Sequence, residues 1–136
     1  MTLDQFKAAR SVLQGVIRTT NLIHSPALSK SCGNQVYLKP ENMQVTGAYK
    51  IRGAYYKIST LSDDEKSRGL ITASAGNHAQ GLPYAAQAAA DSATIVMPTT
   101  TPLVKVNNTK DYGANVILHG EVFDEAAEKA TQLSQE

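Results

Sequence analysis

Three short runs of apolar, partly β-branched residues dominate the second half of the chain, and a segment of helical character follows each one. They are residues 70–74 (LITAS), 93–97 (ATIVM) and 114–118 (ANVIL). Strands that are apolar along their whole length are typical of parallel sheets in which both faces are covered. The pattern therefore predicts an α/β fold, an open parallel sheet with helices on both faces in a three-layer αβα arrangement.

Local signals predict most of the helices between and after these strands. Ser62 and Glu65 have the spacing of a capping box, which opens a short helix before the first strand. A helix is expected from residue 77 to about 90, and an amphipathic helix over residues 121–133 closes the chain.

The first half of the chain is less regular. An amphipathic helix is expected at the N-terminus, opened by a capping box of Thr2 and Gln5. Residues 19–34 are rich in Thr, Ser, Pro, Asn and Gly, which favours an extended surface connection. Residues 35–39 predict a short strand, and a further helix is expected to begin near Thr46 or Gly47.

Composition and charge exclude several classes of protein. A hydrophobic share of 42% and a charged share of 18% are those of an ordinary globular domain, long enough to bury a core. With a formal net charge of +1 and no basic stripe, neither nucleic acid nor an anionic membrane is an expected partner. Cys32 is the single cysteine, which suits a reducing, cytoplasmic setting. No metal site is expected, since this cysteine has no companion ligand.

The stretch SAGNHAQG (residues 74–81) lies where the first apolar strand ends and a helix begins. In such sheets ligands bind outside the carboxyl ends of the strands, and the N-terminus of a helix attracts anions. Gly76 allows close approach of the backbone, Ser74 offers a hydroxyl, and Asn77 can cap the helix while it reaches a ligand. The alternative is that Ser74 and Asn77 only cap a structural helix. His78 by itself is more typical of a solvated histidine.

Lys50 is the second candidate, in the stretch TGAYKIRGA. A lysine that acts as a nucleophile must be partly desolvated, and its neighbours here are small or apolar. Arg52 is expected to add a like charge nearby. The alternative is an ordinary surface lysine near the start of a helix.

Several motifs in a fixed order resemble one enzyme family. LKPENMQVTGAYKIRGA is followed by TASAGNHAQG, ATIVMP, YGANVILHG and FDEAAEKA. Together they resemble the pyridoxal-phosphate enzymes of the tryptophan-synthase-β fold type (fold type II), and most of all their threonine dehydratase (threonine ammonia-lyase) branch. The resemblance implies pyridoxal 5′-phosphate as cofactor, a small amino acid as substrate, a place in amino-acid metabolism and a homo-oligomeric enzyme.

The resemblance also implies roles for individual residues. Lys50 matches the lysine that holds the cofactor covalently and moves protons at the substrate α-carbon. Tyr49 matches the aromatic residue beside the cofactor ring, and Asn77 matches the asparagine that hydrogen-bonds the cofactor's phenolic oxygen. The loop that grips the substrate carboxylate matches Ser74, Ala75, Gly76, Asn77 and His78.

Two details separate this chain from other members of the fold type. Ile51 and Arg52 follow the lysine, where the cysteine synthase branch has Asp-Arg. Serine racemases carry a second serine at the position of Ala75, which has no exchangeable proton. The implied reaction is therefore β-elimination, which converts threonine or serine into 2-oxobutanoate or pyruvate and ammonia. A racemase-like activity or another reaction of the fold type is the alternative.

The family's enzymes are more than twice as long as this chain. The resemblance implies that residues 1–52 open the large cofactor domain and that residues 53–136 form most of the small α/β domain. The family's glycine-rich phosphate cup is absent from this chain, so we expect weak cofactor occupancy and little or no dehydratase activity from it alone. The alternatives are a catalytically silent α/β domain that associates with itself or another chain, and an unrelated small-molecule-binding α/β domain.

Overall fold

The computed structural model describes residues 1–87 and 92–136, and the elements below belong to these residues. The helices, one of them a short 3₁₀ turn, are α1 (Leu3–Val12), α2 (Pro26–Cys32), η1 (Glu41–Met43), α3 (Lys50–Ser59), α4 (Asp63–Ser67), α5 (Asn77–Ala86), α6 (Leu103–Asp111) and α7 (Phe123–Leu133). The strands are β1 (Ile23–His24), β2 (Tyr37–Leu38), β3 (Leu70–Ala73), β4 (Ala93–Met97) and β5 (Asn115–Leu118).

The second half of the chain forms a parallel sheet in the order β3-β4-β5. Alternate residues of the central strand β4 face opposite sides, because successive side chains of a strand point in opposite directions. Ile95 and Met97 pack with Ala79 of α5 and Val106 of α6, whereas Val96 belongs to another cluster on the opposite face. The predicted parallel α/β sheet is confirmed.

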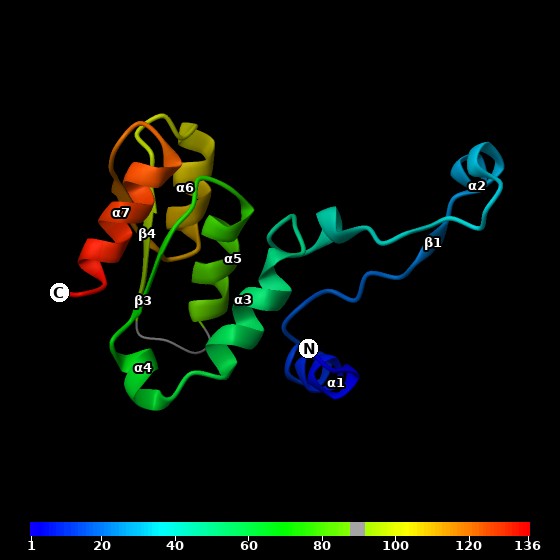
Figure 1. The fold of residues 1–136 in the computed structure, drawn as a ribbon, viewed down its shortest axis with the longest axis horizontal. Coiled ribbons are helices and arrows are strands. Elements are labelled where there is room, and N and C mark those ends of the chain that lie inside the picture. Colours follow the sequence, from blue (N-terminus) through cyan, green and yellow to red (C-terminus); the bar gives the residue numbers. More distant parts are fainter. Residues whose placement is uncertain (88–91) are drawn as a thin grey trace.

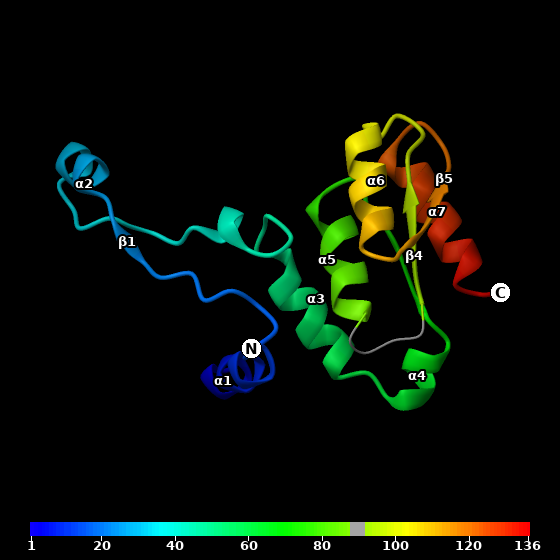
Figure 2. The ribbon, with the colours of Figure 1, turned by 180° about the vertical axis from the view of Figure 1, so that it is seen from behind.

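Helices cover both faces of this sheet (Figure 1). On one face α7 packs Ala126 and Ala130 against Val96. On the other face lie α5 and α6, as the view from behind also shows (Figure 2). The predicted three-layer arrangement is therefore confirmed.

A further helix, α3, packs against the outer side of α5 (Figure 2). Ile51 and Ile58 of α3 are almost fully buried and share a cluster with Ala85 of α5. The two backbones come close at Gly81, where a built Cβ atom would lie 3.4 Å from the Ile51 nitrogen and 3.5 Å from the Lys50 carbonyl carbon. The first turn of α3 thus lies directly against the middle of α5.

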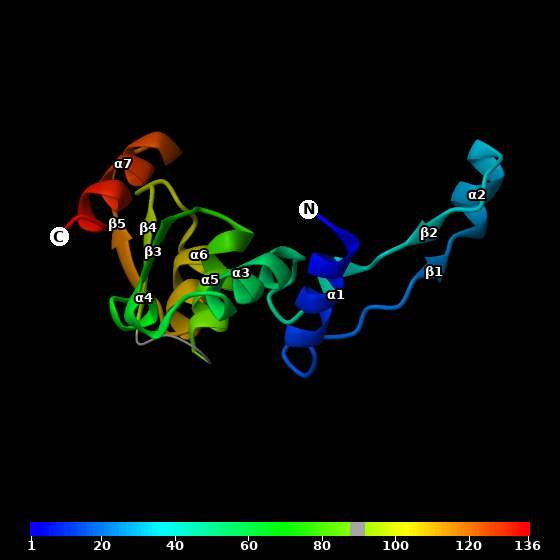
Figure 3. The ribbon, with the colours of Figure 1, turned by 60° about the horizontal axis from the view of Figure 1, so that its bottom comes forward.

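An arm made of β1, α2 and β2 extends away from the sheet (Figure 3). β1 and β2 pair antiparallel, with Ile23 opposite Leu38, and both strands are exposed. The predicted strand in residues 35–39 is confirmed as β2, but the extended connection over residues 19–34 is wrong, because that stretch contains β1 and α2.

The sequence of α2 explains this correction. The Ser25 side chain caps the helix by accepting from the backbone nitrogen of Leu28, and Pro26 occupies its first turn. Gly33 ends the helix in the left-handed region at φ 69°. Residues that individually favour turns here act as helix caps.

Other helix boundaries agree in part with the sequence analysis. The capping boxes of Thr2 with Gln5 and of Ser62 with Glu65 are both formed. The helix expected from Thr46 or Gly47 begins only at Lys50, because Gly47 adopts φ 70° in the preceding turn. The helix expected to reach about residue 90 is observed from Asn77 to Ala86, and its predicted end lies outside the described residues.

Within the described part of the chain, no helix has both the length and the apolar character needed to cross a bilayer.

The contact at Gly81 generates a prediction. Its built Cβ would make ordinary van der Waals contacts, so Gly81→Ala should be accepted and should raise the free energy of unfolding by up to about 1 kcal/mol through helix propensity. Gly81→Leu should lower it by about 1–3 kcal/mol, because the longer side chain forces α5 away from α3. Urea unfolding of each variant measures both effects.

Gly53→Ala is the matched control, since this glycine of α3 has nothing within 4 Å of its built Cβ. A destabilising Gly81→Ala substitution beside a neutral or stabilising Gly53→Ala substitution would contradict the packing described here.

Candidate functional site

The candidate anion loop connects β3 to α5 at the carboxyl end of the sheet. The Ser74 backbone nitrogen donates to the carbonyl of Val96 at 3.1 Å, which continues the ladder with β4 beyond the last residue of β3. The Ser74 hydroxyl, which is buried, accepts from the backbone nitrogen of Gly76 at 3.2 Å. Ala75 lies half-buried between these two residues.

Gly76 is the N-cap of α5, and no side chain caps this helix. The expectation that Asn77 caps it is wrong, because Asn77 is the first helical residue and its side chain is exposed. The alternative reading of Ser74 as a helix cap fails as well, since its hydroxyl accepts from Gly76 in front of the helix. The first N–H groups of α5 therefore remain available for an anion from outside.

Gly76 also leaves open space in front of the helix. A built Cβ at this position would meet no atom of the chain within 4 Å, and its φ of −133° is accessible to any residue. Neither backbone strain nor crowding within the chain therefore requires a glycine here. A ligand that approaches the backbone closely gives a physical reason for one.

Lys50 is the first residue of α3, and Tyr49 precedes it as the N-cap. The Lys50 ammonium lies 5.6 Å from the centre of the Tyr49 ring, within the range of a cation–π contact. Both side chains are exposed, so the desolvation expected from the small and apolar neighbours of Lys50 is not provided by the described residues. Sequence neighbours point in different directions from a helix, and burial depends on what packs over it.

Lys50 and the anion loop lie close together. The backbone of Lys50 packs against α5 at Gly81, one turn after Asn77 and His78. Burial lowers the pKa of His78 below its ordinary value of 6.5, and the positive charge of Lys50 lowers it further. The imidazole is therefore neutral at neutral pH and can accept or donate a hydrogen bond at the edge of the site.

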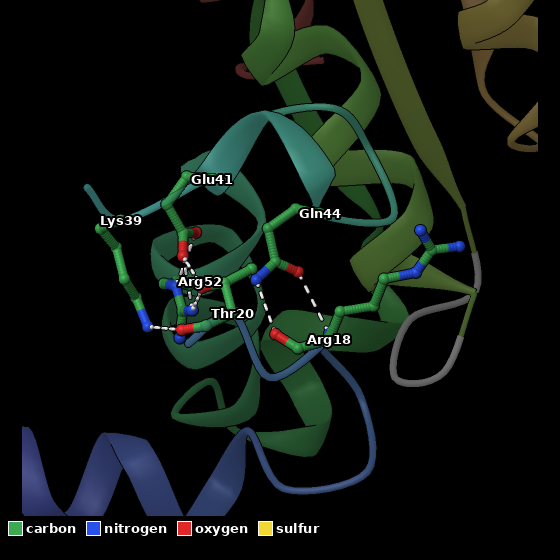
Figure 4. A network of polar contacts seen from close by, with 6 residues as sticks. All are labelled: Arg18, Thr20, Lys39, Glu41, Gln44 and Arg52. Atoms are coloured by element: carbon green, nitrogen blue, oxygen red, sulfur yellow. Dashed lines mark hydrogen bonds and ion pairs between the residues drawn. The ribbon is translucent and has the colours of Figure 1, made fainter. Parts of the chain in front are cut away.

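An ion pair fixes the first turn of α3 on its other side (Figure 4). The Arg52 guanidinium donates two hydrogen bonds to the Glu41 carboxylate, at 2.9 Å from Nε and 2.7 Å from Nη2. The Thr20 hydroxyl donates a third to the same carboxylate at 2.6 Å, and the Lys39 ammonium donates to the Thr20 carbonyl. The hydrogen bonds from Arg52 are the largest cause that lowers the pKa of Glu41 from 4.5 to about 2.

Gln44 extends this network to the N-terminal segment (Figure 4). Its buried side-chain amide donates to the Arg18 carbonyl at 2.8 Å and accepts from the Arg18 nitrogen at 3.2 Å. Together with Glu41, it ties residues 18–20 to the turn before Lys50.

Sequence reasoning missed the roles of Glu41 and Gln44 and treated Arg52 only as a like charge near Lys50. The positive charge of Arg52 does not act as an unpaired like charge near Lys50, because it is paired with Glu41. The role of Gly81 was missed too, although a glycine inside an apolar helix is a signal of close packing. Glu41 carries no such signal in the sequence, because its partner Arg52 lies eleven positions away.

Two other features bear on the site. No group of three or more potential metal ligands occurs in the described part of the chain. A groove of about 1030 Å³ lies between α1, the segment after it and α3, and it does not include Lys50 or the loop 74–78. The candidate site at α3 and the start of α5 is therefore distinct from this groove.

The comparison with protein families defines the class of this protein. The family model described as pyridoxal-phosphate dependent enzyme matches residues 13–136. The chain belongs to this family, which is the one implied by the ordered motifs around Lys50 and the loop 74–78.

Within the family, the chain is similar to threonine ammonia-lyases. It is 50% identical to the L-threonine ammonia-lyase of Thermotoga maritima over 99% of this chain and 34% of that protein. It is 49% identical to a catabolic L-threonine dehydratase of Staphylococcus aureus, over 100% of this chain and 40% of that protein. The chain thus spans little more than a third of the length of the curated relatives that it matches.

Solved structures agree in fold. Threonine deaminase isoform 2 of Solanum lycopersicum matches 99% of this chain and 41% of its own, with a TM-score of 0.84 and 38% identity. Serine racemase of Dictyostelium discoideum matches 99% of this chain and 44% of its own, with a TM-score of 0.90 and 32% identity.

The proximity of Lys50 and His78 generates a prediction. We expect His78 to titrate below pH 6.5 and its pKa to rise in the Lys50→Met variant, because a nearby positive charge is removed. Titration of the imidazole signals by NMR measures both values. Lys57→Met, which removes a charge from the last turn of α3, is the control. Equal responses to the two substitutions would contradict the placement of Lys50 beside the loop.

The pairing of Glu41 generates a second prediction. Its pKa is depressed in the folded chain, so its contribution to stability is complete above pH 4.5 and is lost as the pH falls toward about 2. Glu41→Gln should lower the free energy of unfolding by about 1–2 kcal/mol at pH 7, and the difference should shrink over that acid range. Glu128→Gln, on the exposed side of α7, is the control in urea unfolding. A pH-independent difference would show that the carboxylate charge is not the cause.

Proposed function

We propose that this chain is part of a pyridoxal-phosphate enzyme that eliminates the β-hydroxyl group of L-threonine or L-serine, with release of ammonia and 2-oxobutanoate or pyruvate. The observation that carries the proposal is the packing of α3 on α5. It sets Lys50 beside a helix N-terminus without a side-chain cap, whose N-cap residue, Gly76, has open space in front of it.

The residues present fit one end of the cofactor. Lys50 offers an exposed primary amine, and the open space at Gly76 lies in front of the same helix that Lys50 packs against. Lys50 would hold the cofactor covalently, Tyr49 would lie beside its ring, and Asn77 would hydrogen-bond its phenolic oxygen. When bound, the cofactor supplies an electron sink for the reacting carbon.

Residues of the chain itself would bind the substrate carboxylate and remove the proton. The first N–H groups of α5 and the loop of Ser74, Ala75 and Gly76 would bind the substrate carboxylate, as the positive end of a helix favours an anion. A carboxylate held there fixes the orientation of the α-hydrogen, which the Lys50 amine would remove. The neutral imidazole of His78 would lie next to the substrate carboxylate and would add no charge to the site.

Ala75 favours elimination over racemisation. Racemisation needs a proton donor on the face of the substrate opposite the lysine, and a methyl side chain cannot donate one. The identities of about 50% to proteins named threonine ammonia-lyase and threonine dehydratase support the same choice.

The wider organisation is also proposed. Residues 1–52 would belong to the large domain and residues 53–136 to the small domain of a cytoplasmic homo-oligomer. The projection of the arm of β1, α2 and β2 from the sheet (Figure 3) and the exposure of its strands support a separate first part of the chain. The proposed boundary itself lies within α3. The sequence contains no run of glycines suited to a phosphate cup. The 136 residues alone would therefore bind the cofactor weakly and show little dehydratase activity.

The proposal is tested by fixing the cofactor to the protein. The complete chain, as its gene encodes it, is incubated with pyridoxal phosphate and reduced with borohydride, and the modified lysine is located by peptide mass. We expect modification at Lys50 and production of 2-oxobutanoate from L-threonine, and the loss of both in Lys50→Ala. Lys57→Ala is the control on the same helix and should retain both properties. Modification spread evenly over the lysines would refute the assignment.

Gly76→Ala separates substrate binding from cofactor binding. The added methyl group meets no atom of the described residues apart from its chain neighbours, so modification of Lys50 should be preserved. At this N-cap position alanine should lower the free energy of unfolding only slightly, by about 1 kcal/mol or less. The KM for threonine should rise about tenfold or more, because the methyl group occupies the space of the carboxylate. An unchanged KM would place the substrate elsewhere.

A further inference from the structure

The first turn of α3 lacks the side-chain capping hydrogen bond that commonly stabilises the start of a helix. Its N-cap, Tyr49, is in the helical region at φ −66° and ψ −14° and makes no side-chain capping hydrogen bond. An uncapped terminus frays readily. Lys50 occupies the first position of this turn, so its placement requires another restraint.

Two restraints hold the turn from different sides. On one side the backbone of Lys50 and Ile51 packs against Gly81 of α5. On the other side Arg52 forms its two-pronged ion pair with Glu41. Residues two apart on a helix point about 200° away from each other, so Arg52 faces away from Lys50 and can act on it only through the backbone.

We propose that Arg52 and Glu41 are positioning residues for Lys50. Their ion pair holds the first turn of α3 against α5 and so fixes the lysine in front of the anion loop. The inference deepens the proposed function, since it rests on the role of Lys50 in holding the cofactor.

Glu41 is suited to this role because it is itself held rigidly. It begins η1, and its carboxylate accepts from Thr20 as well as from Arg52. The Thr20 hydroxyl also lies 3.4 Å from the Arg52 Nη2 atom, which closes a three-residue cluster (Figure 4). The side-chain exposure is 16% for Glu41 and 32% for Arg52, so the pair is partly shielded from solvent.

The segment between the two partners explains why an ion pair is needed. Residues 44–49 link η1 to α3 by a turn in which Gly47 adopts φ 70°. The ion pair adds a non-covalent restraint on this side, next to the hydrogen bonds that Gln44 makes with Arg18. An arginine fork on a carboxylate fixes both distance and orientation, which a lysine at the same position would not.

The test reverses the charges in the complete chain. Glu41→Arg and Arg52→Glu are made singly and together, and the rate of Lys50 modification by pyridoxal phosphate with borohydride is measured relative to that of Lys105 on α6. We expect each single reversal to slow modification of Lys50 about tenfold or more, because misplacement of a reacting group is costly. The double reversal should restore most of the rate.

Hydrogen exchange is the second measurement. The amides of residues 51–54 should exchange faster in each single variant and regain protection in the double variant. Arg68→Glu is the matched control, since it breaks an exposed pair with Asp64 on α4 and should change neither measurement. Arg52→Lys, a milder change that keeps the charge, replaces any reversed variant that does not fold, and it should slow modification by a smaller factor.

The outcomes separate the two proposals. If the unsubstituted protein is not modified at Lys50, the cofactor assignment fails, and the exchange data alone decide whether the ion pair holds the turn. If Lys50 is modified at the same rate in all variants, or if the double reversal is as slow as the single ones, the positioning role is refuted.

Discussion

The close packing of α3 on α5 is the contact on which the rest of the site depends. At Gly81 the two helix backbones come close enough that a Cβ atom would touch the main chain of Lys50 and Ile51. The sheet fixes the start of α5, because Ser74 is hydrogen-bonded to β4 just before that helix begins. Because α3 packs on α5, the position of α5 also sets the position of α3. Burial of the apolar side chains of Ile51 and Ile58 stabilises this packing. Two segments separated by more than twenty residues in sequence therefore form one surface.

The polar network around Glu41 complements this hydrophobic contact. Packing of apolar side chains is strong but not directional, whereas the fork of Arg52 on Glu41 fixes an orientation. Gln44 adds a pair of hydrogen bonds to Arg18, so the segment before α3 is tied to the N-terminal part of the chain as well. The lysine of the proposed site, Lys50, is itself exposed. In our proposal its position is fixed by the packing of α3 on α5 and by the pair of Arg52 with Glu41.

The sequence predicted the sheet and its layers well, because local patterns carry that information. Nearly continuous apolar strands such as Ala93–Met97 indicate burial on both faces, and Ser62 with Glu65 specifies a helix start on its own. The arm was predicted less well, since Pro26 and Gly33 favour turns and helix caps alike, and only the packing context distinguishes them. The pairing of Arg52 with Glu41 left no local signal. Motif order located Lys50 and residues 74–78, but their spatial proximity depends on the contact at Gly81.

Fold likeness by itself does not select the reaction. The TM-score is higher for the serine racemase of Dictyostelium discoideum than for the tomato threonine deaminase, while the sequence identity ranks them in the opposite order. Proteins of both names therefore share this backbone arrangement, so the reaction has to be argued from the site and not from the fold. In the proposed function Ala75 is the position that favours elimination, because it sits in the loop that precedes α5 and its methyl side chain has no proton to donate. A serine there would add a hydroxyl to a loop that already contains Ser74, without any change in the helices that present Lys50. Under the proposed function, the choice between elimination and racemisation rests on this one side chain, while the packing of α3 on α5 stays the same.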